Sequence, residues 1–209
     1  MSAPGSRPRK LALASLALFF LVVPLVVNSS FWLGLWTMAL FFALLGQSWN
    51  ILGGFGGQIS FGHAVFFGTG AYATAMLQLK FGINAWASAA LAVAAGTLVG
   101  AFIGAVSFRY GLRGSYFALV TLAFAEVFRV LVNAWDFAGA GFGMLLTLKP
   151  GTANLQFADR IWYYYLVLVL VAISLAIAVW LKHSRFGAYL IAIRENEDAA
   201  QALGIDCLR

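Results

Sequence analysis

Charged residues are scarce in this chain. Asp, Glu, Lys and Arg make up 10% of its 209 residues, whereas 63% are hydrophobic and the mean hydropathy is +0.91. This composition excludes an ordinary soluble domain, whose surface needs far more charge. The apolar runs recur at intervals close to the roughly 20 residues that a helix needs to cross a hydrocarbon core of about 30 Å. Barrel strands would alternate in polarity instead. We therefore expect an all-α integral membrane protein, a polytopic bundle of transmembrane helices.

Cysteine and histidine are almost absent as well. Cys207 is the single cysteine, which excludes an internal disulfide and a CxxC redox motif. His63 and His183 lie far apart in the sequence and make no metal-ligand pair. The net charge of +6 comes from basic residues that stand singly or in small groups at the ends of apolar runs. This distribution favours membrane topology over nucleic-acid binding.

Six segments are long enough, or nearly so, to cross a membrane: residues 11–27, 31–52, 61–79, 85–107, 115–134 and 161–181. The first resembles a signal peptide, but it exceeds the usual apolar region of about 7–15 residues and no A-x-A site follows it, so a span is favoured. The aromatic cluster at residues 162–165 is typical of a membrane interface. We expect a cytoplasmic tail (1–10), a transmembrane domain (11–181) and a cytoplasmic segment (182–209).

The distribution of Lys and Arg predicts the orientation of these spans. With the N-terminus in the cytoplasm, nine basic residues fall inside, three fall outside, and Arg129 lies within a span. Because cytoplasmic segments carry the excess of positive charge, this asymmetry predicts that the N-terminus and the segment from residue 182 onward are cytoplasmic.

The stretch 50–75 interrupts the apolar pattern. Four glycines fall within five residues (Gly53, Gly54, Gly56 and Gly57), and each costs a helix roughly 1 kcal/mol. We expect no continuous helix there. Broken backbone at membrane depth survives only where protein or a water-filled cavity satisfies its polar groups. Polar side chains flank the glycines on both sides: Gln47, Ser48 and Asn50, then Gln58, Ser60 and His63.

Two interpretations of this stretch stay open. One is a translocation pathway or gate, for which the candidate residues are Asn50, Gly57, Gln58, Ser60 and His63. The other is a tight cytoplasmic turn with helix caps supplied by Asn50 and Ser60. His63 itself is better explained as a hydrogen-bonded structural residue than as a proton carrier.

Two further features lie within the expected spans. Glu126 falls near the middle of segment 115–134, and an ionisable group at that depth is a functional candidate. Pairing with Arg129 at i, i+3 is the structural alternative. Gly96, Gly100 and Gly104 share one helix face, where a neighbouring helix can approach closely.

The tail contains a short helix with clear boundaries. Asn196 can cap it, Glu197 and Asp198 suit its positive N-terminal end, and Gly204 fits the position that ends it. Ala199, Ala200 and Leu203 supply a small apolar patch. A helix of about seven residues is too short to be stable alone in water, so we expect a docking partner.

Three motifs in this order resemble the permease subunit of bacterial branched-chain amino-acid ABC importers. They are GQISFGHA at 57–64, continuing through Gly68, Gly70, Ala71 and Tyr72; LRGSYFALVTL at 112–122, continuing through Glu126 and Arg129; and RFG at 185–187 with AIRENEDAA at 192–200 and LGI at 203–205. The resemblance covers the chain from about residue 31 to its end, and it favours the pathway or gate interpretation of the broken stretch.

The resemblance implies a transport subunit rather than an enzyme, with no catalytic residue, metal or cofactor of its own. It implies a bacterial inner-membrane location and four kinds of partner: a second related permease, two ABC ATPase subunits that bind ATP and Mg, a periplasmic substrate-binding protein and the lipid bilayer. The tail resembles the EAA loop of ABC importers, with aspartate in place of glutamate. By that likeness the residues that couple to the ATPase are Glu195, Glu197, Asp198, Ala199, Ala200 and Gly204.

The chain departs from the family pattern at residues 138–143, where a Gly-Gly-Pro-rich segment is usual, and at its end. The family normally continues with further spans beyond the coupling loop, so a chain that stops at Arg209 is expected to be truncated, either as a fragment or as a non-functional remnant. A secondary transporter or channel acting alone, with Glu126 as ion carrier, is the other alternative. The substrate itself stays open, because related permeases serve urea or short amides.

Overall fold

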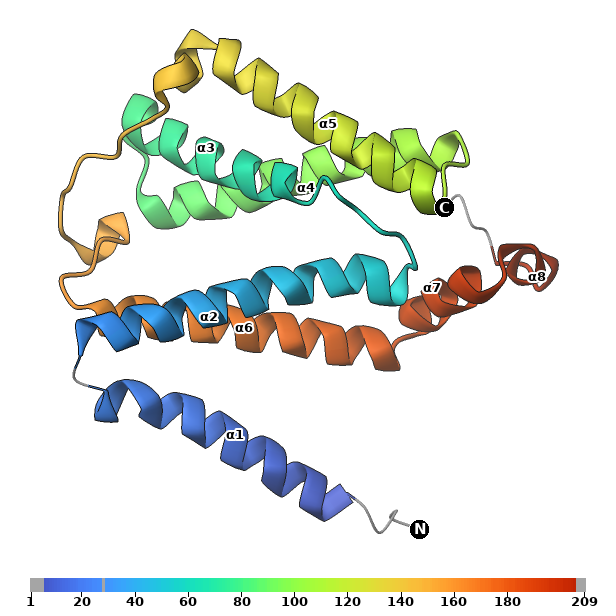
Figure 1. Ribbon diagram of the computed structural model, residues 1–209, viewed down its shortest axis with the longest axis horizontal. Coiled ribbons are helices and arrows are strands. Elements are labelled where there is room, and N and C mark those ends of the chain that lie inside the picture. The colour runs from blue at the N-terminus through green and yellow to red at the C-terminus, as the bar shows by residue number, and fades with distance from the viewer. Residues whose placement is uncertain (1–5, 28, 206–209) are drawn as a thin grey trace. The chain divides into compact units, whose positions relative to one another are not determined.

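The computed structural model describes residues 6–27 and 29–205, which form helices and connecting loops with no strand among them. The long helices follow one another along the chain (Figure 1): α1 (Ser6–Val26), α2 (Ser30–Asn50), α3 (Ala64–Phe81), α4 (Ala85–Arg109), α5 (Gly114–Ala134) and α6 (Arg160–His183). Two shorter helices, α7 (Arg185–Glu195) and α8 (Glu197–Ala202), come last. The all-α class expected from composition is confirmed. Cys207 and Arg209 lie outside the described residues.

Four helical segments have the length and hydropathy needed to cross a membrane: Ser30–Phe55, α4, α5 and α6. They correspond to four of the six expected spans. The other two expected segments are also helical, as α1 and α3. The described apolar part of α1, Ala14–Val26, is shorter than a span, and α3 does not reach the same hydropathy.

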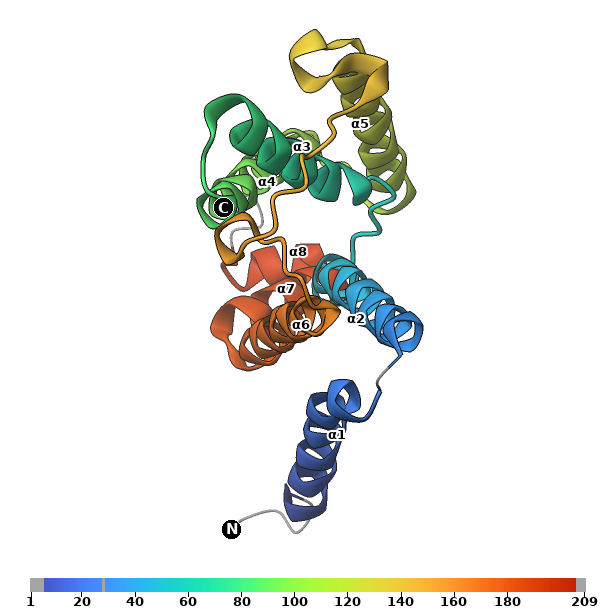
Figure 2. The ribbon, with the colours of Figure 1, turned by 90° about the vertical axis from the view of Figure 1, so that its left-hand side faces the viewer.

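The chain divides into two compact units. One contains the chain up to Gln47 together with Phe157–Ala178, and the other contains Ser48–Gln156 together with the chain from Val179 onward. The first unit holds α1, most of α2 and most of α6. Its buried centre consists of Val23, Leu33, Leu40 and Tyr164. In both views α2 runs alongside α6 (Figures 1 and 2).

Pro24 leaves a backbone acceptor free inside α1, because proline has no N–H to donate to the carbonyl of residue i−4, here Phe20. The hydroxyl of Tyr164 donates to that carbonyl at 2.8 Å, and the hydroxyl of Tyr165 donates to the carbonyl of Leu21 at 3.2 Å. Tyr164 is fully buried. Tyr164 therefore fills the centre of the unit and satisfies a backbone group that Pro24 frees.

In the second unit α3 and α4 form a closely packed antiparallel pair, with α5 beside them (Figures 1 and 2). Gly82, in the left-handed conformation, ends α3, and the side chain of Asn84 caps α4 by accepting from the Trp86 N–H at 2.9 Å. A Cβ at Gly96 or Gly100 would lie 3.6 or 3.5 Å from Phe66 of α3. Gly96 and Gly100 therefore face α3, but a Cβ at either position would make only an ordinary van der Waals contact, so this contact does not itself require glycine.

Gly104 does not share this interface, since the nearest atom to a Cβ at that position belongs to Phe108 of the same helix. Several large apolar side chains of α4 are exposed, among them Leu91, Val93 and Leu98. Lipid tails are as apolar as these side chains, so a membrane helix can leave them uncovered by protein. Between α5 and α6 the chain forms three short 3₁₀ turns, at Asp136–Ala138, Ala140–Phe142 and Thr152–Asn154.

Candidate functional site

The glycine-rich stretch begins as a continuation of α2. A π-helical turn, η1 (Ile51–Phe55), extends the helix through Gly53 and Gly54. The expected break is present, but it begins two glycines later: Gly53 and Gly54 are still helical, and the non-helical part runs from residue 56 to residue 63 and includes Gly56 and Gly57. A π-helical turn keeps the backbone hydrogen-bonded while widening the helix, and such turns are frequent at functional sites.

The non-helical segment folds back towards the end of α2. The indole N–H of Trp49 donates to the carbonyl of Ser60 at 2.9 Å. Asn50 makes no side-chain cap bond, and the Ser60 hydroxyl has no partner among the described residues. The caps that the tight-turn interpretation assigned to Asn50 and Ser60 are therefore not formed among the described residues.

Thr121 of α5 anchors the far end of this segment. Its hydroxyl oxygen accepts from the backbone N–H of Phe61 at 3.2 Å and of Gly62 at 3.4 Å, and its proton goes to the carbonyl of Ala118 at 2.8 Å. A Cβ at Gly62 would overlap the Thr121 carbonyl oxygen. Glycine is required here because the two backbones touch. Thr121 is seven residues into α5, or about 10 Å along its axis, so the segment meets α5 well beyond its first turn.

Arg194 of α7 anchors the other end. Its Nη1 donates to the carbonyl of Gly54 at 2.5 Å, and its guanidinium also pairs with Glu195. Gly57 has a φ of +65°, and a Cβ there would overlap the aliphatic stem of Arg194. Gly57 is thus fixed both by its backbone conformation and by the side chain that lies against it. The first and third sequence motifs meet at this contact.

Three polar side chains in the segment carry buried atoms without a hydrogen-bond partner among the described residues: Oε1 of Gln58, Oγ of Ser60 and Nδ1 of His63. Burial lowers the pKa of His63, which keeps the imidazole neutral near pH 7. Its ring lies edge-on to Phe66. A neutral, ring-packed imidazole fits a structural role better than that of a proton carrier, but the hydrogen bond expected of this histidine is not formed at Nδ1 among the described residues.

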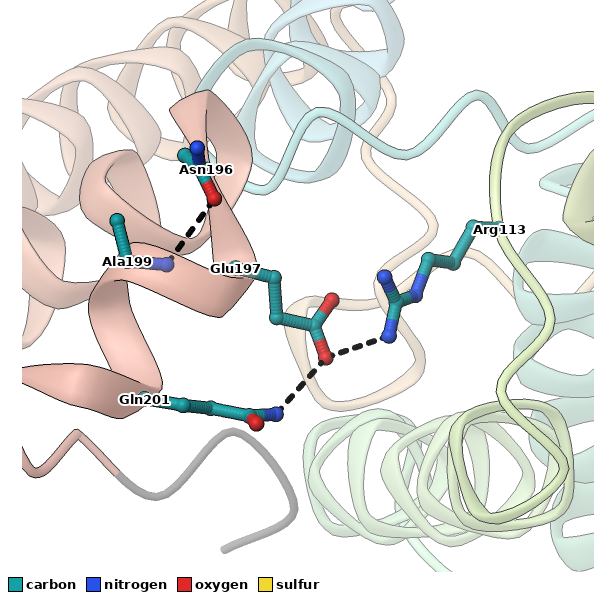
Figure 3. A network of polar contacts seen from close by, with 5 residues as sticks. All are labelled: Arg113, Asn196, Glu197, Ala199 and Gln201. Atoms are coloured by element: carbon teal, nitrogen blue, oxygen red, sulfur yellow. Dashed lines mark hydrogen bonds and ion pairs between the residues drawn. The ribbon is translucent and has the colours of Figure 1, made fainter.

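The short tail helix has the caps that the sequence predicts. The side-chain oxygen of Asn196 accepts from the Ala199 N–H at 3.0 Å (Figure 3). Beyond α8, Gly204 adopts a φ of +83°, the left-handed conformation that ends helices. Ahead of it lies α7, which the sequence reasoning missed. Ser184 caps α7 by accepting from the Gly187 N–H at 3.0 Å, and a serine three residues before that glycine was the available signal.

Glu197, the first residue of α8, is tied to the connection between α4 and α5. Its Oε1 lies 2.7 Å from Nη2 of Arg113 and also accepts from the side-chain amide of Gln201 at 3.5 Å (Figure 3). Sequence reasoning placed Glu197 and Arg113 in two separate motifs without joining them. It likewise missed the roles of Thr121 and Arg194, because contacts between segments 59 or more residues apart leave no local pattern.

The surface of α8 is divided. Ala200 is 2% exposed, whereas Leu203 is 83% exposed, and Asp198, Ala199 and Gln201 are exposed as well. Glu195, just before the helix, is also exposed. The exposed side therefore combines an acid with small and apolar side chains on a helix of six residues.

Glu126 and Arg129 form an ion pair on α5. Nε of Arg129 donates to Oε2 of Glu126 at 2.8 Å and Nη2 lies 2.5 Å from Oε1. The pair lines a groove of about 310 Å³ between α3 and α5. Among the residues that the structure describes, no three His, Cys, Asp or Glu side chains are grouped so that they could hold a metal ion.

Apolar spans joined by a hydrogen-bonded, glycine-rich break, with a capped helix attached to that break, define this chain as a polytopic helical membrane protein. The family described as "Branched-chain amino acid transport system / permease component" matches residues 31–209. The chain therefore belongs to this family.

Two curated relatives carry the name "High-affinity branched-chain amino acid transport system permease protein LivM". The one from Salmonella typhimurium is 29% identical over 197 residues, which cover 83% of this chain and 46% of the relative. The one from Escherichia coli K12 is 28% identical over 221 residues, which cover 94% of this chain and 51% of the relative. The chain thus spans about half the length of these relatives. No solved structure matches it significantly.

Proposed function

We propose that this chain acts as an inner-membrane permease subunit of an ATP-driven importer of branched-chain amino acids, with its N-terminus and the segment 182–209 in the cytoplasm. Membership of the permease family and the names of the two relatives support the substrate class. The partners are a second related permease, two ABC ATPase subunits that bind ATP and Mg, and a periplasmic substrate-binding protein. The chain contributes no cofactor of its own.

The observation that carries this proposal is the attachment of an exposed, capped helix to the glycine-rich break. A helix of six residues is not stable alone in water. The buried Ala200 and the Glu197–Arg113 ion pair support α8 on one side, which leaves its exposed side available to a partner. Asp198, Ala199 and Leu203 offer that side to the ATPase. Ala200 is buried, so among the coupling residues expected from the sequence it supports α8 from within.

Movement of α8 has a short physical path to the break. Arg194 precedes the Asn196 cap by two residues and holds the carbonyl of Gly54, while Gly62 at the other end of the segment rests on Thr121 of α5. A displacement of α7 and α8 therefore pulls on the segment between two fixed contacts. The mechanism that follows is alternating access, in which ATPase closure moves α8 and opens or closes the path beside this segment.

The polar atoms of the segment fit a path for a hydrophilic solute. A buried polar atom without a partner costs about 1–3 kcal/mol, and the segment gathers three of them on Gln58, Ser60 and His63. Water or a passing zwitterion can satisfy these atoms during transport. An ordinary tight turn would have no reason to concentrate them.

Gly204 provides the test. In vesicles reconstituted with the partner subunits, Gly204→Val should lower leucine uptake at least fivefold while ATP hydrolysis continues, because a β-branched residue does not fit a φ of +83°. Gly204→Asn is the matched control, since asparagine tolerates the left-handed conformation, and it should retain uptake. Unchanged coupling in the valine variant would count against the proposal. Uptake that follows the proton gradient and persists without ATP would favour a secondary transporter instead.

A further inference from the structure

The groove between α3 and α5 has the size and lining of a small-molecule site. Its volume of about 310 Å³ is at the lower end of the range for ligand pockets, roughly 300–1,000 Å³. Apolar side chains form most of its wall, including Val65, Leu122 and Val132, and Thr69 and Tyr72 of α3 add two hydroxyls. All of these residues belong to the second unit.

Glu126 and Arg129 are the charged residues of this lining. Their side chains are 59% and 63% exposed, so the ion pair faces open space. A pair that served only to neutralise two charges within a span would gain from being covered by protein, since intramembrane charges are normally turned towards partners in the bundle interior. Here one anion and one cation are presented side by side at the edge of an apolar groove.

An α-amino acid carries the complementary charges. Its carboxylate and its ammonium group are both attached to Cα, so they lie side by side, as the two charged groups of the protein do. The carboxylate can accept from the planar guanidinium of Arg129, the geometry in which arginine binds carboxylates best, while the ammonium group donates to Glu126. A branched aliphatic side chain would then lie against the apolar wall.

We propose that Glu126 and Arg129 are the substrate-contacting residues of this chain and that they bind the zwitterionic head of a branched-chain amino acid by exchanging their mutual ion pair for two ion pairs with the ligand. This inference rests on the proposed transport function and names a site for it. After this exchange, Glu126 and Arg129 each still have one oppositely charged partner. The bound substrate therefore has both of its charges compensated at this site.

Direct binding to the full chain in lipid nanodiscs tests the site independently of the periplasmic binding protein. Ligand-observed NMR is used with leucine, leucinamide, which lacks the carboxylate, and isocaproate, which lacks the ammonium group. The wild-type chain should bind leucine at least fivefold more tightly than either analogue. Equal binding of all three compounds would overturn the inference. This comparison uses only the wild-type chain, so a folding defect in a variant cannot obscure the result.

The variants then assign the two contacts. Glu126→Gln should weaken leucine binding at least fivefold and leave isocaproate unaffected, whereas Arg129→Gln should weaken leucine and leave leucinamide unaffected. Asp159→Asn, an exposed acid-to-amide change outside the groove, should alter nothing. Loss of the second permease from the purified complex in either variant, with leucine binding unchanged, would overturn the inference and assign the pair to subunit contact.

Uptake measurements separate this inference from the function on which it rests. If the wild-type complex in vesicles takes up no branched-chain amino acid with ATP, the proposed function fails. If it does so and both variants transport leucine with unchanged KM and rate, the function stands and only the site fails.

Discussion

Nη2 of Arg113 lies 2.7 Å from Oε1 of Glu197, so the residue that precedes α5 is paired with the first residue of α8 (Figure 3). Arg194 makes a second attachment, to the carbonyl of Gly54 in η1. The segment formed by α7 and α8 is thus held at two points. One point is on the connection between α4 and α5, and the other is on the extension of α2.

Removing the Arg113–Glu197 pair should loosen α8 locally. Both side chains are partly exposed, and surface ion pairs contribute only about 0–1 kcal/mol, so Arg113→Gln and Glu197→Gln should each change the free energy of global unfolding by less than about 1 kcal/mol. Hydrogen exchange of the α8 amides should nevertheless accelerate, because opening of this helix is a local event.

A double-mutant cycle provides the control for this prediction. Glu197→Gln also removes a negative charge from the positive end of α8, an effect shared by Asp198→Asn, which breaks no ion pair that the structure shows. The exchange rates should therefore rise more in Glu197→Gln than in Asp198→Asn. In an Arg113→Gln background the two acid variants should become equal, and a persistent difference would contradict a role for the pair.

Gly62→Ala should destabilise the chain because the new methyl group would overlap the Thr121 carbonyl oxygen. Overpacking of this kind costs about 1–3 kcal/mol, measurable by unfolding in mixed detergent micelles. Gly70→Ala is the matched control, since Gly70 lies within α3 with nothing within 4 Å of a Cβ. It should be neutral or stabilising by up to about 1 kcal/mol. Equal effects of the two changes would show that Gly62 does not touch α5.

The pH dependence of stability should carry the signature of His63. Its folded-state pKa lies below the ordinary value of 6.5 because of burial. The neutral form therefore stabilises the fold, and this contribution is fully present above pH 6.5 and is lost as the pH falls through the folded-state pKa. His63→Gln, which stays neutral, should remove that part of the pH dependence. The stability of the two proteins is compared between pH 5 and 7.5, roughly the range in which histidine titrates. Parallel profiles would contradict a contribution of His63 to the pH dependence.

Local signals in the sequence were sufficient to place most of the helices, with α7 as the exception. Apolar runs of spanning length located α2, α4, α5 and α6, and the caps at Asn196 and Gly204 were read correctly because they depend on residues a few positions apart. Gly53 and Gly54 misled the prediction. The π-helical turn keeps them hydrogen-bonded, and glycine propensity alone does not describe that arrangement.

The candidate site could be predicted only in its parts. The polar residues Gln58, Ser60 and His63 can be recognised within an apolar sequence. The residues that hold their segment in place cannot. Gly57 needs Arg194, and Gly62 needs Thr121, yet each pair is separated by tens of residues and is formed by chain packing. Pro24 and Tyr164 are a second example. The sequence predicts that Pro24 leaves the carbonyl of Phe20 without its helical donor, but it does not predict that the Tyr164 hydroxyl donates to this carbonyl.

Tyr164→Phe isolates that last relationship. The change leaves the Phe20 carbonyl without a donor in a buried position, which should cost about 1–3 kcal/mol in the free energy of unfolding. Tyr165→Phe removes a longer bond made by a more exposed hydroxyl and should cost less. Both are measured by detergent-induced unfolding of the full chain.

Pro24→Ala supplies the decisive comparison. Alanine at this position carries an N–H that can donate to Phe20 in the ordinary i→i−4 pattern, so the carbonyl no longer depends on Tyr164. In the Pro24→Ala background, Tyr164→Phe should therefore cost less than about 1 kcal/mol, the scale of a single replaceable hydrogen bond. If Tyr164→Phe costs the same in both backgrounds, Pro24 does not determine the role of this hydroxyl, and the hydroxyl stabilises the unit whether or not the Phe20 carbonyl has a second donor.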